Sequence, residues 1–214
     1  VGTATMMAAE GAIYPVDQLM EDAGEPFDPA DYLASVVGYY TTPEGQMLSM
    51  PFNSSTPVLY YNKALFEQAG LDPETPPATW AEMSAMIDEL QAAGVPCGMT
   101  TGWQSWVQIE NMSAWHDVPL GTLENGFAGL GTEFVFNDTV AVDHIAMLGE
   151  WQQTKKFDYG GRRSESAPKF YSGECAFYMN SSASYAGVAN NTDFDFGIGM
   201  LYYHANVEGA PQNS

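Results

Sequence analysis

The sequence has 214 residues, of which 45% are hydrophobic, and its 27 acidic and 6 basic side chains give a formal net charge of −21. A chain of this size can bury a core for one large domain or two lobes, and no apolar run approaches the roughly 20 residues that span a membrane. Nucleic acids and anionic membrane surfaces are disfavoured as partners, because both are bound by clustered cations.

The first third of the sequence predicts short helices around one pair of strands. Helices are expected over residues 3–10, 15–23 and 63–69, strands over 46–51 and 58–61, and a loop over 26–32. Gly11 and Gly24 follow the first two helices as stop signals, and Asn62 is placed to cap the third.

The rest of the sequence alternates helices with strands. Strands are expected over 95–100, 175–179 and 194–201, and helices over 80–94, 103–115 and 166–171, with further helices capped by Asp138 and opened by residues 180–184. Thr79 and Glu82 have the spacing of a capping box. The helix after Asp138 carries an apolar stripe that we expect to be buried, formed by Ala141, Ile145, Leu148 and Trp151. His144 lies beside this stripe and is interpreted as structural. The alternation of elements predicts an α/β fold.

Two tryptophans follow a glycine at the start of the segment 103–115. Trp103 and Trp106 are three residues apart, so they would lie on one face of the first helical turn. One interpretation places both in the core, as is usual for aromatic residues at helical spacing. The other makes them an aromatic wall over a helix N-terminus, where free N–H groups favour an anion. Such a site would suit a small molecule with an apolar backbone and a phosphate or hydroxyl head.

Two serine-rich turns adjoin predicted strands, at residues 53–55 and 180–182. Hydroxyl and backbone N–H groups in such turns can hold phosphate or sugar oxygens without a cationic side chain. Ligands of open α/β sheets bind at the carboxyl ends of strands. Ordinary turn and cap chemistry accounts for either turn alone. The two turns together with the tryptophan turn favour a binding site.

Catalytic and cofactor motifs are missing from the sequence. The three histidines form no zinc-binding pattern, and the sequence has no Gly-x-Ser-x-Gly elbow, Walker loop or Gly-x-Gly-x-x-Gly fingerprint. We therefore expect no metal, no cofactor and no enzymatic activity.

Two pairs of side chains leave alternatives open. Cys97 and Cys175 are either two buried thiols or one disulfide, which would require an oxidising compartment. Arg162 and Arg163 are the only neighbouring arginines, and they either face a binding cleft or form surface salt bridges, of which we expect the second.

Several blocks resemble a known family over essentially the whole sequence. The strongest are residues 1–8, 51–63, 70–74, 102–106, 144–148 and 210–213. With these blocks the chain resembles the glycerol-phosphate-binding branch of the maltose-binding-like solute-binding proteins of ABC importers. The block Asn-Ser-Ser-Thr-Pro, together with Trp-Gln-x-Trp, is specific to that branch.

The resemblance implies an α/β, two-lobe periplasmic-binding-protein type II fold that closes about a hinge on a ligand in the interlobe cleft. Residues 1–55 would be part of the first lobe, 56–195 the second lobe, and 196–214 a strand returning to the first. The chain would then be an internal fragment that lacks N- and C-terminal parts of the family's fold, including some residues of its pocket.

The resemblance also implies a function and a site. Ser55 and Ser181 correspond to ligand-binding serines of the family, and Trp103 and Trp106 to its paired tryptophans. The ligand would be sn-glycerol 3-phosphate or a glycerophosphodiester such as glycerophosphocholine, delivered to the permease subunits of an ABC transporter. The receptor would be a monomer in the periplasm, or a lipid-anchored protein outside a Gram-positive cell. Two alternatives stay open: a sugar receptor of the same fold and a glycerophosphodiester hydrolase.

Overall fold

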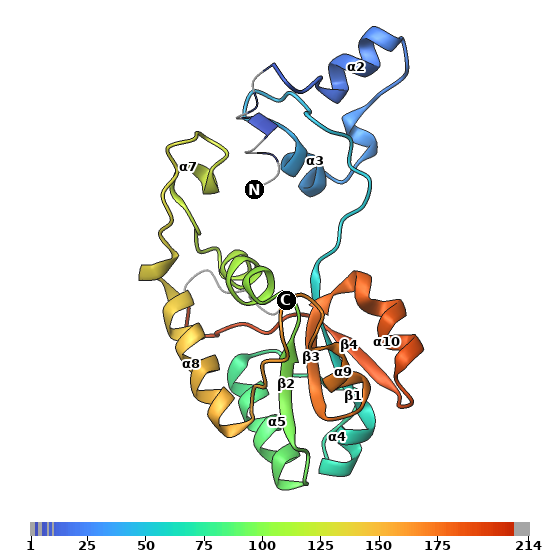
Figure 1. The fold of residues 1–214 in the computed structure, drawn as a ribbon, viewed down its shortest axis with the longest axis vertical. Helices are drawn as coiled ribbons and strands as arrows, with labels where there is room; N and C mark the ends of the chain where they lie inside the picture. The colour runs from blue at the N-terminus through green and yellow to red at the C-terminus, as the bar shows by residue number, and fades with distance from the viewer. Residues whose placement is uncertain (1–2, 4–5, 8, 10, 208–214) are drawn as a thin grey trace. The chain divides into compact units, whose positions relative to one another are not determined.

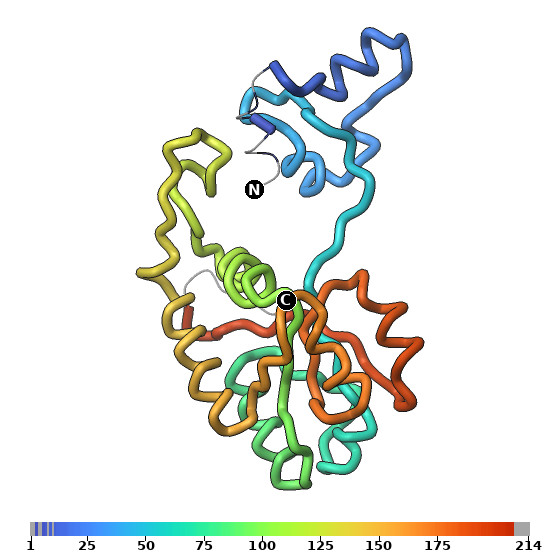
Figure 2. Tube along the Cα trace, viewed as in Figure 1, coloured from blue at the N-terminus to red at the C-terminus, as the bar shows by residue number. Residues whose placement is uncertain are grey.

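A computed structural model describes residues 3, 6, 7, 9 and 11–207 of the chain (Figures 1 and 2). The predicted helix over 3–10 and the predicted returning strand 196–214 therefore lie partly outside the described residues. The chain divides into two compact units, the first comprising Val1–Ser54 and Pro119–Val135, and the second Ser55–Val118 and Phe136–Ser214. Each unit has its own packing.

The first unit is built of short helices and turns. Its elements are α2 (Val16–Ala23), η1 (Pro29–Asp31), α3 (Ala34–Tyr40) and α7 (Thr122–Asn125). The predicted helix over 15–23 is confirmed as α2, and Gly24 ends it in the left-handed conformation with a φ of 72°. Helix α3 was not predicted, because its run of valines and tyrosines is more typical of a strand.

The predicted strand over 46–51 is wrong. Met47 forms a single bridge to Thr41, and no strand is built there. The N–H of Met47 donates to the carboxylate of Asp17 at 3.1 Å, and its carbonyl accepts from the N–H of Val16 at 2.9 Å. The N–H and carbonyl groups of Met47 are thus hydrogen-bonded to the start of α2, so they need no partner strand.

The second unit contains a mixed four-stranded sheet in the order β2-β3-β1-β4. Its strands are β1 (Pro57–Asn62), β2 (Cys97–Thr101), β3 (Cys175–Ser181) and β4 (Phe196–Gly199). Strands β2 and β3 are parallel, whereas β1 is antiparallel to both β3 and β4. The predicted strands over 58–61, 95–100 and 175–179 are confirmed to within about two residues at each end, and that over 194–201 is shorter than expected.

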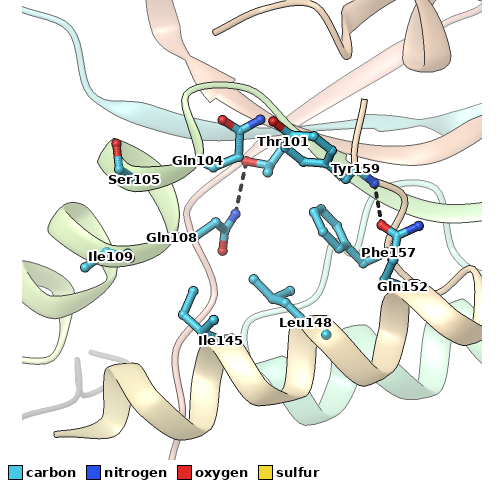
Figure 3. A pocket seen from close by; sticks show the side chains of 11 residues that line it. Thr101, Gln104, Ser105, Gln108, Ile109, Ile145, Leu148, Gln152, Phe157 and Tyr159 are labelled. Atoms are coloured by element: carbon cyan, nitrogen blue, oxygen red, sulfur yellow. Dashed lines mark hydrogen bonds between the residues drawn. The ribbon is translucent and has the colours of Figure 1, made fainter. Parts of the chain in front are cut away.

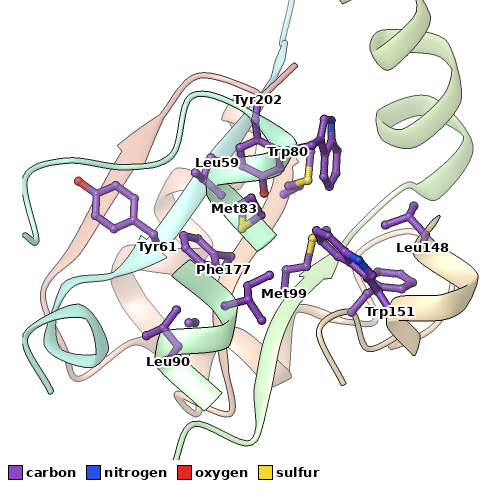
Figure 4. Packing of buried hydrophobic residues seen from close by; sticks show 14 of the residues in the cluster. Leu59, Tyr61, Trp80, Met83, Leu90, Met99, Leu148, Trp151, Phe177 and Tyr202 are labelled. Atoms are coloured by element: carbon purple, nitrogen blue, oxygen red, sulfur yellow. The ribbon is translucent and has the colours of Figure 1, made fainter. Parts of the chain in front are cut away.

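Helices cover both faces of this sheet, and the residues of β1 alternate between them (Figure 1). Leu59 and Tyr61 face the larger core with the helices α4 (Lys63–Ala69), α5 (Trp80–Ala92) and α8 (Val140–Thr154). Tyr60 faces the smaller core with α9 (Ala167–Tyr171) and α10 (Tyr185–Asn191). Figure 4 shows Trp80, Met83 and Leu90 of α5 packed over the sheet residues of the larger core. This three-layer arrangement confirms the predicted α/β class.

The predicted caps of α5 and α4 are confirmed, and that of α8 is corrected. Thr79 and Glu82 form the predicted capping box at α5, and Asn62 caps α4 by accepting from the N–H of Leu65 at 3.1 Å. Helix α8 is capped by Thr139, whereas Asp138 lies in the preceding 3₁₀ turn η3 (Phe136–Asp138). The stripe is also shifted, since Ile145 is 44% exposed and His144 is fully buried in its place. Within the described part of the chain, no helix is both long and apolar enough for a bilayer crossing.

The two compact units divide the chain at other residues than the predicted lobes, which stay a prediction. Residues 119–135 belong to the first unit, although the sequence placed them within the second lobe. Strand β4 pairs with β1 through Tyr60 and Ile198, so it completes the sheet of the second unit. Neither feature has a local sequence signal, because both depend on pairing between distant segments.

The two cysteines form a disulfide, which resolves the alternative that the sequence left open. Cys97 and Cys175 are paired residues at the starts of the adjacent parallel strands β2 and β3. Both are buried, and the bridge joins residues 78 apart in the sequence. A cross-link over such a long loop restricts the unfolded chain strongly.

Replacing both cysteines by alanine should lower the free energy of unfolding by about 4 kcal/mol, through the loop entropy returned to the unfolded state. Alanine places no polar atom in the buried site, so the loss reports the cross-link and little else. Urea unfolding of the oxidised protein, the variant and the reduced protein measures this difference. The variant and the reduced protein should unfold at the same, lower urea concentration. A variant as stable as the oxidised protein would contradict the assignment.

Candidate ligand-binding site

A cavity of about 360 Å³ lies at one edge of the sheet in the second unit. Strands β2 and β3 end at this edge, where Gly102 and Ser181 stand, and β1 begins there after Ser55. The cavity is lined by Ser55, Trp103, Trp106, Ser181, Ala183 and Ser184. The structure therefore brings together all four residues singled out in the sequence. The long-range pairing of β1 with β3 makes neighbours of two serines that are 126 residues apart.

The two serine turns are fixed to each other by two hydrogen bonds between Thr56 and Ser182. The N–H of Ser182 donates to the carbonyl of Thr56 at 2.8 Å, and the N–H of Thr56 donates to the hydroxyl of Ser182 at 3.3 Å. The hydroxyl oxygen of Ser181 accepts from the N–H of Ala183 at 3.1 Å and caps the turn η4 (Ser182–Ser184). Its hydrogen is left to donate, and the hydroxyl of Ser55 has no partner among the described residues. Both serines thus present donors to the cavity.

Trp103 lies outside the helix that the sequence placed it in. Its φ of 47° is left-handed, and the helical residues begin at Gln104. The N–H of Trp103 donates to the carbonyl of Arg163 at 2.7 Å, and its own carbonyl accepts from Val107 at 2.9 Å. The expectation of one shared helical face is therefore wrong for Trp103. The position of Trp103 is set by its backbone hydrogen bond to Arg163, which the spacing of nearby residues cannot predict.

Trp106 opens a π-helical turn, η2 (Trp106–Asn111), that continues into α6 (Met112–Trp115). The carbonyl of Trp106 accepts from the side chain of Asn111 at 2.8 Å, which satisfies a group displaced from regular helical bonding. Trp106 is half-buried against the larger core, whereas Trp103 is 42% exposed. Neither ring is fully buried, and no described residue accepts from either indole N–H. Both rings therefore have surface to offer a ligand.

Gly102 allows the loops of the site to approach one another. A Cβ atom there would lie 2.9 Å from the carbonyl oxygen of Arg163 and 3.0 Å from the side chain of Asn180. Asn180 is buried, and it accepts from the N–H of Ser181 at 2.8 Å while donating to the hydroxyl of Ser164 at 3.3 Å. Asn180 thus joins the loop that carries Arg163 to the serine turn.

A second cavity, of about 410 Å³, lies between η2 and α8 (Figure 3). Its lining is largely apolar, with Ile145, Leu148 and Phe157 facing three glutamines. Each glutamine already donates to the protein: Gln104 to the carbonyl of Gly161, Gln108 to the hydroxyl of Thr101 at 3.0 Å, and Gln152 to Asp158 at 3.1 Å. A polar ligand would find fewer free donors here than in the cavity of the two tryptophans, which is therefore the candidate site.

A network of two buried histidines and the half-buried His204 adjoins the segment that follows Trp106. His144 contacts Gln108 Oε1 through Nε2 at 3.0 Å and His204 Nε2 through Nδ1 at 3.1 Å. The backbone N–H of His204 donates to His116 Nε2 at 2.8 Å. Burial, with the neighbouring His204 and His116, lowers the pKa of His144 to about 3. The sequence prediction of a structural His144 agrees with this arrangement, but the network itself was missed because its members are far apart in the chain. The described residues contain no group of three or more His, Cys, Asp or Glu side chains arranged to hold a metal ion.

The sequence matches the bacterial extracellular solute-binding protein family over residues 1–210. It is 49% identical over 215 residues to the sn-glycerol-3-phosphate-binding periplasmic protein UgpB of Salmonella typhimurium, covering 100% of this chain and 49% of that protein. It is 50% identical to the UgpB of Yersinia pestis over the same share of each. The chain thus spans about half the length of these relatives.

Solved structures of similar fold include UgpB from Mycobacterium tuberculosis in complex with glycerophosphocholine. That match has a TM-score of 0.72 at 23% identity and covers 94% of this chain and 50% of the other. A substrate-binding protein from Listeria monocytogenes in complex with cycloalternan matches with a TM-score of 0.74 at 19% identity, covering 95% and 51%. The second unit's sheet and helices thus belong to a periplasmic-binding-protein fold, and the chain is a member of the bacterial extracellular solute-binding protein family.

Proposed function

We propose that the protein is the solute receptor of an ABC importer and captures sn-glycerol 3-phosphate or a glycerophosphodiester such as glycerophosphocholine. It would act as a monomer in the periplasm or outside the cell, pass its ligand to the permease and catalyse no reaction. The first unit would be part of one lobe of the receptor and the second unit most of the other. The relatives at 49–50% identity, which are named for sn-glycerol 3-phosphate, support this assignment.

One observation carries the proposal, namely the cavity that combines two indole rings with unpaired donors. The rings of Trp103 and Trp106 can cover the carbons of a glycerol unit, and their size suits a small ligand. The hydroxyls of Ser55 and Ser181 and the two indole N–H groups can donate to phosphate or hydroxyl oxygens. For glycerophosphocholine, the same rings can attract the quaternary ammonium.

A sugar receptor is the second candidate, and a specific observation favours it. Tryptophan rings and hydroxyl donors also suit sugars, and structures of similar fold include the protein in complex with cycloalternan. The two ligand classes differ in charge, so comparing a phosphate ester with a neutral sugar separates them.

Stoichiometric capture without turnover tests the receptor against the hydrolase alternative. The full gene product is mixed with one equivalent of glycerophosphocholine, and the phosphorus resonance is followed by NMR. We expect one bound ligand that is recovered unchanged after prolonged incubation. Release of choline or glycerol at a rate set by the protein concentration would contradict a receptor and support a hydrolase.

Replacing Ser55 by alanine should weaken binding of sn-glycerol 3-phosphate by about 1–3 kcal/mol, because a hydrogen bond to a charged oxygen is lost. Titration calorimetry on the full gene product measures the change. Ser54→Ala is the matched control, since Ser54 is the neighbouring serine and does not line the cavity. Equal affinities of both variants and the wild type would remove Ser55 from the site.

A further inference from the structure

The lysines and the arginines of this chain differ in whether they form salt bridges. All four lysines form salt bridges: Lys63 with Glu74, Lys155 and Lys169 with Asp158, and Lys156 with Asp88, at 2.6–2.9 Å. Arg162 and Arg163 form none with any described residue, contrary to the expectation that they make surface salt bridges. In a chain with 27 acids and 6 basic residues, an unpaired arginine is unusual.

Arg163 lies beside the candidate site and contacts one of its lining residues, Trp103. Its guanidinium carbon lies 5.4 Å from the centroid of the Trp103 ring, which lines the cavity. The backbones of the two residues are joined by the 2.7 Å bond from Trp103 N–H to the Arg163 carbonyl. Both residues have a φ of 47°. The next residue, Ser164, is bonded to Asn180, which directly precedes Ser181. The loop is therefore tied to two walls of the cavity.

A cation beside this cavity would favour an anionic ligand. A net charge of −21 repels a phosphate ester at long range, and the described residues that line the cavity carry hydroxyl, indole and methyl side chains. A guanidinium offers paired N–H donors that match two phosphate oxygens, and its charge is permanent. Cation–π attraction to the indole can hold the guanidinium near the cavity, and no described residue forms a salt bridge with it.

We propose that Arg163 is the side chain of this unit that binds the phosphate, and that it makes the site prefer a phosphate monoester over a neutral sugar or a zwitterion. This inference rests on the proposed function. Because the guanidinium occupies one face of Trp103, a quaternary ammonium has less of that ring available. Removing Arg163 should therefore cost sn-glycerol 3-phosphate more affinity than glycerophosphocholine.

The test compares R163Q with R162Q and R163K in the full gene product. Arg162 is the matched control, since it is an adjacent exposed arginine that stacks on no ring of the cavity. Calorimetric dissociation constants are measured for both phosphate compounds at low and at high salt, and unfolding midpoints verify that each variant is folded. We expect R163Q to weaken sn-glycerol 3-phosphate binding about 10- to 100-fold and to reduce its salt dependence. The dissociation constant of R162Q should stay within about twofold of wild type. That of R163K should lie between the values of wild type and R163Q.

The outcomes separate this inference from the proposed function. If wild type binds phosphate esters and R163Q binds them equally well, Arg163 is not the phosphate partner, while the receptor assignment stands. If R162Q loses as much affinity as R163Q, the effect is one of general charge and the inference is overturned. If wild type binds neither phosphate compound, the proposed function itself fails.

Discussion

Replacing Trp106 by alanine should raise the dissociation constant for a phosphate ligand at least a hundredfold, about 3 kcal/mol of binding free energy. Trp106 lines the candidate cavity on one side and packs against the larger core on the other. A ring supported in this way is rigid before the ligand arrives, so little entropy is lost when a glycerol unit is covered. Alanine would leave the cavity open to water on that side.

The measurement is a calorimetric titration of wild type, Trp106→Ala and Trp106→Phe. Phenylalanine keeps an apolar ring in the same place, so its affinity should lie between the other two. Near-ultraviolet circular dichroism and the unfolding midpoint distinguish lost binding from lost structure. A folded Trp106→Ala variant that binds as tightly as wild type would show that the ligand lies elsewhere.

Acid should begin to destabilise the protein near pH 6.5, where the histidines of the unfolded chain start to bind protons. The pKa of His144 is lowered from 6.5 to about 3, by burial and by the neighbouring His204 and His116. Burial, with His116, also lowers the pKa of His204 to about 4, although Asp143 opposes this. The unfolded chain therefore binds more protons than the folded one below pH 6.5, so stability falls as the pH is lowered. At pH 4.5 the His144 contribution alone is a loss of about 3 kcal/mol.

Urea unfolding at pH 7 and pH 4.5 measures this loss. The carboxylate of Asp158 is buried, which raises its pKa, but hydrogen bonds from Lys169, Lys155 and Gln152 outweigh this and hold the pKa at about 2. Asp158 therefore loses its stabilising contribution only as the pH falls from 3.8 towards 2, below the chosen window. His144→Gln cannot titrate, so its stability should change less between the two pH values. Equal stability of wild type at both would contradict a buried neutral His144.

Local signals in the sequence predicted the second unit well. The capping box at Thr79, the cap at Asn62 and the apolar runs of β1 and β3 each act within a few residues, so their elements form where expected. The first unit was predicted poorly. Residues 46–51 look like a strand, but the backbone groups of Met47 bond to α2, 30 residues earlier in the sequence, and the N–H of Leu48 bonds to the end of α3. Propensity is overridden where distant segments supply the partners.

In the candidate site too, features with a local signal were predicted and those that depend on distant segments were not. The four predicted residues were found from residue type and family resemblance, and they do converge on one cavity. The position of Arg163 over Trp103 had no sequence signal, because two left-handed residues 60 apart in the chain hold each other in place. The histidine network was likewise missed, since its members come from segments far apart in the sequence.

The proposed receptor has a phosphate-selective cavity walled by Trp103 and Trp106, two of the five tryptophans of this chain, and tryptophan fluorescence reports on their surroundings. The full gene product is titrated with sn-glycerol 3-phosphate, glycerophosphocholine and maltose in parallel, at low and at high salt. We predict a saturable change in emission with the phosphate compounds, tightest for sn-glycerol 3-phosphate, and no response to maltose. A saturable response to maltose alone would mean that the serine and tryptophan turns form a sugar site, and the assignment would be wrong.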